Sequence, residues 1–154
     1  MKNNVRIPLP RDDEYISLLG EVVYSFAYYE WTIIYIVEYL ESGFIAEYCR
    51  GRPLESGKVK RRLEDTIKKD LNHPLIVQVQ DCCKDFSELI ERRNALIHAH
   101  PITAEGGEQV LNHQGIISKK YHDVLWTKTE IESFLYDVDQ AAVSAAEILD
   151  LLRK

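Results

Sequence analysis

The chain has 154 residues, 45% of them hydrophobic and 29% charged, with a formal net charge of −6. This length gives one ordinary domain with its own core, and this composition excludes a disordered chain. The negative charge argues against a general polyanion binder, the start MKNNVRIPLP does not resemble a secretory signal, and no run of about 20 uncharged apolar residues could span a membrane. Three cysteines (Cys49, Cys82 and Cys83) make no disulfide framework, so we expect a reducing cytoplasm.

The first predicted helix begins near Asp12 or Asp13 and ends near Ser42–Gly43. Acidic residues suit the positive end of a helix dipole. Apolar residues recur every three or four positions and predict a packed face: Ile16, Leu19, Val23, Phe26, Ile33, Val37 and Leu40. Glu30 interrupts this face. A short helical piece, FIAEYC, is predicted at 44–49.

An aromatic stripe lies beside the apolar face of this first helix: Tyr24, Tyr28, Trp31 and Tyr35. The helix is therefore apolar nearly all round, which is typical of a central or an interface helix. Such a stripe can stack RNA bases, but aromatic residues more often belong to a core or a dimer interface. We take the stripe as support for a homodimer.

A basic segment, residues 50–69, holds eight Lys or Arg and three Asp or Glu, a local charge of +5. A helix is predicted from Ser56 to about Leu71 within and just beyond it. A local basic patch can bind phosphate even on an acidic protein, whereas the alternative is a solvated helix face. The candidate RNA contacts in this segment are Lys58, Lys60, Arg61 and Arg62.

The next helix is predicted to start with Pro74 at its first position and to end before Pro101. Its apolar face steps by three and four through Leu75, Val79, Cys82, Phe86 and Leu89. The next member of that series is Arg93. Gly106–Gly107 and Gly115, among short β-branched patches, predict a small hairpin or irregular excursion at 102–126.

The last helix is predicted to open at the TKTE sequence, where Thr127 and Glu130 have capping-box spacing, as do Thr129 and Glu132. Its apolar face is Ile131, Phe134, Val138, Ala141, Ala145, Ile148 and Leu152. The predicted fold is an all-α bundle of four to five helices, a single domain over 1–154, with a small β-hairpin or irregular insertion before the last helix.

Two charged residues, Glu30 and Arg93, lie on apolar faces. Burying either charge alone is costly, so we expect them either to pair with each other or to line one polar cleft. Asn94 and His98 are four apart and share a helix face, whereas Arg93 and His98 diverge by roughly 140° around the axis. Arg93 and His98 can therefore act together only if the helix end loosens near Pro101, or if a two-fold axis supplies a second copy.

The stretch RNALIH, residues 93–98, resembles the signature of the HEPN superfamily: an arginine, a polar residue, and a histidine after a spacing of four to six. The helical layout, with the motif late in the chain at the end of a long helix, is also similar. The resemblance implies an HEPN-like bundle that acts as a homodimer. It implies metal-independent endoribonuclease activity, with no cofactor and a composite site at the dimer interface, in a toxin–antitoxin or defence setting.

In such a site His98 is the expected acid/base, because histidine titrates near neutral pH. Arg93 is the expected phosphate clamp, because its fork matches phosphate oxygens. Asn94 is expected to position the substrate, and Glu30 to orient His98 or Arg93. Arg92 is a further candidate RNA contact, with a solvated arginine as the alternative.

The expected partners are RNA, a second copy of the chain, and an antitoxin or a nucleotidyltransferase, with no membrane. Some HEPN members carry a tyrosine two residues after the histidine, which a partner nucleotidyltransferase modifies. Here that position is His100, which puts such regulation in doubt. His100 either assists catalysis or caps the helix C-terminus, where a cation is favoured, and we expect the cap.

Two alternatives compete with the nuclease. A non-catalytic HEPN-like module would use Arg93 and Asn94 to join helices and the basic segment to contact RNA or a protein. A metal site would have to draw on His98, His100, His113, His122 and Asp123. Their spacing matches no zinc pattern, and the cysteines are not arranged as C-x-x-C.

Overall fold

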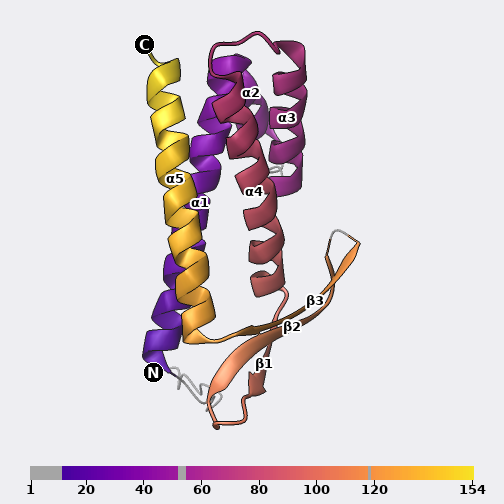
Figure 1. Ribbon diagram of the computed structural model, residues 1–154, viewed down its shortest axis with the longest axis vertical. Helices are drawn as coiled ribbons and strands as arrows, with labels where there is room; N and C mark the ends of the chain where they lie inside the picture. Colours follow the sequence, from indigo (N-terminus) through magenta and orange to yellow (C-terminus); the bar gives the residue numbers. More distant parts are fainter. Residues whose placement is uncertain (1–11, 52–54, 118) are drawn as a thin grey trace, which may run out of the picture.

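The computed structural model describes residues 12–51, 55–117 and 119–154. The amino-terminal MKNNVRIPLP and residues 52–54 of the basic segment lie outside the described part. The described elements are α1 (Asp13–Leu40), α2 (Phe44–Arg50), α3 (Ser56–Lys69), α4 (Ile76–Ile97), β1 (His100–Thr103), β2 (Gln109–Ile117), β3 (Lys120–Trp126) and α5 (Lys128–Leu152). The helices form an elongated bundle, and the strands lie across the end where α4 finishes and α5 begins (Figure 1). The predicted helical bundle with an insertion before the last helix is thus confirmed in outline.

Helix α1 begins where the acidic residues predicted. The side chain of Asp12 caps the helix by accepting a hydrogen bond from the Tyr15 backbone N–H at 3.0 Å. The helix ends at Leu40, slightly before the predicted end, because Gly43 adopts a left-handed φ of 100° and starts α2 instead. The short helical piece predicted at 44–49 is this α2.

The predicted apolar face of α1 is only partly right. Phe26, Ile33 and Val37 are buried, but Ile16 and Val23 are 45% and 53% exposed. The core instead receives their neighbours Tyr15 and Val22, together with Tyr29. Adjacent helix positions differ by about 100°, so this choice rotates the amino-terminal half of the face away from the predicted direction.

The aromatic stripe on α1 lies at the surface. Tyr24 and Tyr28 are 77% and 60% exposed, and Trp31 and Tyr35 are 41% and 42% exposed. Trp31 packs edge-on against Tyr48 of α2, with ring centroids 5.5 Å apart. A core role for the stripe is therefore wrong.

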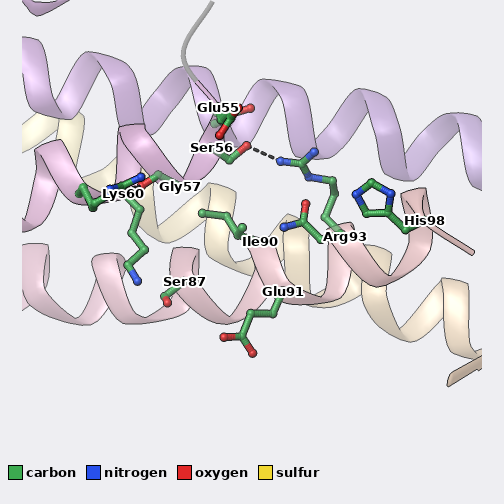
Figure 2. A pocket seen from close by; sticks show the side chains of 12 residues that line it. Glu55, Ser56, Gly57, Lys60, Ser87, Ile90, Glu91, Arg93 and His98 are labelled. Carbon is green, nitrogen blue, oxygen red and sulfur yellow. Dashed lines mark hydrogen bonds between the residues drawn. The ribbon is translucent and has the colours of Figure 1, made fainter. Parts of the chain in front are cut away.

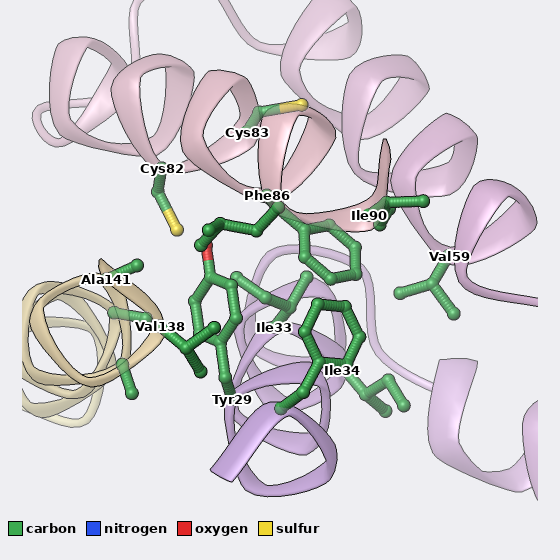
Figure 3. Close-up of a cluster of buried hydrophobic side chains, with 14 of the residues drawn as sticks. Tyr29, Ile33, Ile34, Val59, Cys82, Cys83, Phe86, Ile90, Val138 and Ala141 are labelled. Atoms are coloured by element: carbon green, nitrogen blue, oxygen red, sulfur yellow. The ribbon is translucent and has the colours of Figure 1, made fainter. Parts of the chain in front are cut away.

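The core lies between α1, α4 and α5, with α3 closing one side. Phe86 of α4 contacts Tyr29 edge-on at 5.5 Å, and Val138 of α5 completes this cluster (Figure 3). The predicted face of α4 is buried from Val79 onward, whereas Leu75 is partly exposed. Pro74 does not begin α4, because residues 74–75 form a turn and the helix starts at Ile76.

Helix α5 agrees with its prediction. Its apolar face is buried from Ile131 to Ile148, with Leu152 partly exposed at the end. Thr127 caps the helix by accepting from the Glu130 backbone N–H at 3.2 Å. The Thr127 N–H itself donates to the Leu125 carbonyl at 3.0 Å, so the second half of the capping box is replaced by a strand contact.

The insertion is a three-stranded antiparallel sheet in the order β1–β2–β3. The predicted hairpin corresponds to β2 and β3, but β1 was not predicted. Its first residue is His100, which pairs with Asn112, while His98 is the C-cap of α4. The prediction that His100 caps the helix is therefore wrong, because the chain has already entered the sheet at that position.

The sheet is attached to α1 by one buried hydroxyl. Tyr15 Oη donates to the Trp126 carbonyl at 2.7 Å and accepts from the Leu111 backbone N–H at 2.9 Å. Trp126 also packs on Phe134 of α5, with ring centroids 5.7 Å apart. No described helix is long and apolar enough to cross a membrane.

Candidate functional site

A pocket of about 720 Å³ opens between α1, α3 and α4 (Figure 2). We call it the α1–α3–α4 pocket. Six residues that the sequence singled out line it: Glu30 from α1, Lys60 and Arg61 from α3, and Arg93, Asn94 and His98 from the end of α4. The RNALIH motif thus faces a cavity together with part of the basic segment.

Arg93 and His98 line the same pocket of one chain. Helix α4 ends at Ile97, and His98 has φ −93° and ψ 4° as its C-cap. The His98 N–H still donates to the Asn94 carbonyl at 3.0 Å, so the chain leaves the helix only at this residue. Of the two arrangements the sequence allowed, a loosened helix end is the one observed, and a second copy is not needed to bring the two side chains to one cavity.

The side chain of Arg93 is held from two sides. Its Nη2 donates to Ser56 Oγ at the start of α3, and its guanidinium carbon lies 5.0 Å from the centroid of the Phe26 ring (Figure 2 shows the bond to Ser56). Its Nε is buried without a hydrogen-bond partner. Among the described residues, no carboxylate lies within ion-pair distance of Arg93. The guanidinium is therefore oriented but not neutralised by a neighbour.

Glu30 is in a similar position with the opposite charge. Its Oε1 is buried and has no hydrogen-bond partner. Within the described ranges it pairs with neither Arg93 nor His98, so the predicted ion pair and the predicted orienting contacts are not formed. Because buried polar atoms are almost always satisfied, an unpaired acceptor and an unpaired donor in one pocket indicate that water or a ligand occupies the space between them.

The charges lining the pocket balance. Lys60, Arg61 and Arg93 are matched by Glu30, Glu55 and Glu91. Lys60 lies 3.4 Å from Glu64, and Arg61 Nε donates to the Gly57 carbonyl at 3.3 Å. A purely cationic phosphate sink would lack these carboxylates, so the lining suits a ligand that carries hydrogen-bond donors as well as anionic oxygens.

Other parts of the basic segment are not at the pocket. Arg62 pairs with Glu41 at 3.2 Å and with Glu47, and its guanidinium lies 5.2 Å from the Phe44 ring centroid. Lys69 pairs with the same Glu41 at 2.8 Å. These cations join α1, α2 and α3, and Lys58 also lies outside the pocket lining. Of the four candidate contacts in this segment, only Lys60 and Arg61 face the cavity.

Arg92 lies on another side of α4. It forms ion pairs with Asp137 and, at 3.6 Å, with Glu130, both on α5. Its guanidinium carbon is 4.7 Å from the Phe134 ring centroid. Neighbouring helix residues diverge by about 100°, which separates Arg92 from Arg93 completely. Arg92 therefore fastens α4 to α5 and is not part of the pocket.

Two residues at the site were not predicted. Phe26 was expected only as a core residue, and Ser56 only as a helix start, yet together they hold Arg93. No sequence signal links them to Arg93, because the three lie on three different helices. His100, His113 and His122 do not line the pocket, and in the described part of the chain no group of three or more His, Cys, Asp or Glu side chains could hold a metal ion.

No family model, no curated protein and no solved structure matches this chain. The function of the pocket is therefore argued from its own residues.

Proposed function

We propose that the protein is a metal-independent endoribonuclease of HEPN type whose active site is the α1–α3–α4 pocket. The observation that carries the proposal is the presence of Arg93, Asn94 and His98 on one cavity wall, with Lys60 and Arg61 opposite. Arg93 stabilises the charge that develops on the phosphate, and His98 transfers the proton. Asn94 positions the substrate, and Lys60 and Arg61 contact neighbouring phosphates.

The way Arg93 is held supports this role. A cation fixed by Ser56 and Phe26 before substrate arrives needs little reorganisation when charge builds on the phosphate. Its Nε remains available, since it is buried and unpaired. A guanidinium already engaged by carboxylates, as Arg92 is, would offer far less to a phosphate.

The test is cleavage of a broad RNA panel by purified protein in EDTA. Wild type is expected to cut, and His98→Ala and Arg93→Ala are expected to lose about 100-fold or more of the rate while remaining folded. His100→Ala and Arg92→Ala are the neighbouring controls, because neither side chain lines the pocket. An intact RNA panel, or equal cleavage by the His98 and Arg93 variants, would refute the nuclease.

We further propose that the working form is a homodimer. The exposed aromatic stripe on α1 supports this, because such a surface on a soluble chain is typical of an interface. Sedimentation at micromolar concentration is expected to give a dimer, and Tyr28→Ser with Trp31→Ser a monomer. A wild-type monomer would contradict the composite site. An antitoxin or nucleotidyltransferase partner, in a toxin or defence setting, belongs to the same proposal.

The alternative is a non-catalytic RNA- or protein-binding module. It is favoured by the contacts of Arg93, which join α1, α3 and α4 and so have a structural value of their own. This alternative requires that wild type bind RNA or a protein without cutting RNA, and that His98→Ala bind equally well. Arg93→Ala would then lower the unfolding free energy without a separate effect on chemistry.

A further inference from the structure

The α1–α3–α4 pocket contains two buried polar atoms of opposite hydrogen-bonding character. Glu30 Oε1 can only accept while the carboxylate is charged, and Arg93 Nε can only donate. Neither atom has a partner in the described residues. When a substrate displaces water from the pocket, each atom left unmatched opposes binding. The favoured substrate therefore offers a donor to Glu30 and an acceptor to Arg93.

The two atoms belong to neighbouring places in the pocket. Phe26 and Glu30 are four residues apart on α1, so they lie one turn apart on the same side of the helix. The Arg93 guanidinium carbon is 5.0 Å from the Phe26 ring, which puts the guanidinium about one helical turn from Glu30. A ligand that reaches both groups must carry its donor and its acceptor close together.

A free phosphate does not meet this requirement. It satisfies Arg93, but it brings anionic acceptors towards the Glu30 carboxylate and repels it. A ribonucleotide does meet it, because its 2′-hydroxyl is a donor next to the acceptor oxygens of its 3′-phosphate. Deoxyribose lacks that donor, and the 2′-hydroxyl is the group by which proteins distinguish RNA from DNA.

We infer that Glu30 accepts the hydrogen bond, and then the proton, of the ribose 2′-hydroxyl. This rests on the proposed function, and it gives Glu30 a direct catalytic role in place of the orienting role expected from the sequence. The pocket then selects RNA through Glu30 and binds its phosphate through Arg93. Both functions come from one chain, since both residues line one cavity.

The step balances as follows in atoms and charge. Glu30 takes the proton from O2′, and O2′ forms a bond to phosphorus while the bond from phosphorus to O5′ breaks. Protonated His98 gives its proton to the departing O5′. The products are a 2′,3′-cyclic phosphate and a 5′-hydroxyl, with Glu30 protonated and His98 neutral. Proton exchange with water restores both residues.

The decisive variant is Glu30→Gln, which keeps the shape of the side chain but cannot take the proton. Glu21→Gln is the matched control, because Glu21 is an exposed glutamate of the same helix outside the pocket lining. Melting curves check that both fold, and Glu30→Asp, which keeps a carboxylate, replaces the first variant if it does not. One measurement is the affinity for an oligonucleotide as RNA, as DNA and as 2′-O-methyl RNA, in EDTA.

Wild type is expected to bind RNA about tenfold more tightly than the other two, because one hydrogen bond to a charged group is involved. Glu30→Gln is expected to lose most of this preference, and Glu21→Gln to keep it. In single-turnover cleavage, Glu30→Gln is expected to be about 100-fold slower and to lose the rate increase that follows ionisation of the base. Mass spectrometry is expected to find the cyclic phosphate.

Failure of this inference can be told from failure of the proposed function. If wild type cuts through Arg93 and His98 but Glu30→Gln cuts as fast, the role of Glu30 is refuted while the nuclease stands. Equal wild-type affinity for the three oligonucleotides refutes it as well, as does a Glu30-dependent preference for a base without one for ribose. If wild type cuts nothing, the nuclease fails, and a ribose preference that depends on Glu30 still supports its contact with the 2′-hydroxyl.

Discussion

The guanidinium of Arg93 lies over the ring of Phe26, with 5.0 Å between the guanidinium carbon and the ring centroid. Phe26 also stacks on Phe86, with centroids 6.3 Å apart, so the support of Arg93 is continuous with the core. Ser56 holds the other side of the same guanidinium. The position of this cation therefore depends on the packing of three helices, and changes in that packing are expected to reach the pocket.

Phe26→Leu is expected to lower the unfolding free energy by about 1–2 kcal/mol and to weaken RNA binding several-fold, because it removes core volume and the face beneath the cation. Urea denaturation and titration with RNA measure the two effects. Phe86→Leu is the control, since it removes similar volume from the same stack without a recorded contact to Arg93. Equal effects of both variants on RNA binding would contradict a specific role of Phe26.

Two adjacent arginines are expected to behave differently. Arg92→Ala removes two partly exposed ion pairs and the contact with Phe134, so the unfolding free energy is expected to fall by about 1–2 kcal/mol while RNA affinity is unchanged. Arg93→Ala is expected to weaken RNA binding. A double-mutant cycle of Arg92 with Asp137 measures the ion pair. Loss of RNA affinity in Arg92→Ala at full stability would restore the contact expected from the sequence.

Tyr15→Phe is expected to loosen the sheet from α1. It leaves the Leu111 N–H and the Trp126 carbonyl without the shared hydroxyl, at a cost of about 1–3 kcal/mol. Amide hydrogen exchange is expected to accelerate at Leu111. Tyr136→Phe removes a hydroxyl from a tyrosine that is 64% exposed and serves as control. Unchanged exchange at Leu111 would mean that other contacts hold the sheet.

Acid is expected to weaken the start of α1. The Tyr15 backbone N–H and, next, Lys128 lower the pKa of Asp12 from its ordinary value of 3.8. A lowered pKa in the folded state means that the charged form stabilises the fold above pH 3.8, and that this stability is lost as pH falls through the folded-state value. Asp12→Asn is therefore expected to be less stable than wild type at neutral pH and equal to it in strong acid. Urea midpoints from pH 2 to pH 7 test this, and parallel curves would contradict it.

Lys128 responds in the opposite direction. Hydrogen bonds to Glu14 and then to Asp12 raise the pKa of Lys128 above 10.5. This contribution is present below that pH and is lost as pH rises through the folded-state value. Lys128→Gln should thus remove the same ion pair that Asp12→Asn removes, and the two changes combined should cost less than their sum.

Several features of the fold were predictable because they are local. The three- and four-residue steps of α4 and α5 identify the buried faces, since each helix has one unbroken apolar series from Val79 to Leu89 and from Ile131 to Ile148. The caps at Asp12 and Thr127 were also predictable, because a cap needs only residues within one turn. For the same reason the motif at 93–98 could be placed at a helix end before Pro101.

Other features depend on contacts that no local pattern contains. In α1 the pairs Tyr15–Ile16 and Val22–Val23 are both apolar, so only packing against α5 decides which member is buried. Strand β1 is four residues long and contains a proline, which weakens any strand signal, and it exists because β2 supplies its hydrogen-bond partners.

The sequence by itself determined that a basic, titratable motif closes a long amphipathic helix in an otherwise helical chain, because periodicity and turn residues act over a few positions. Only the tertiary structure decided which of two neighbouring arginines faces the pocket. Arg92 and Arg93 are chemically identical, and a rotation of about 100° gives one to α5 and the other to Ser56, Phe26 and the cavity. The same packing leaves Glu30 unpaired beside Arg93, although the sequence allowed the two to neutralise each other.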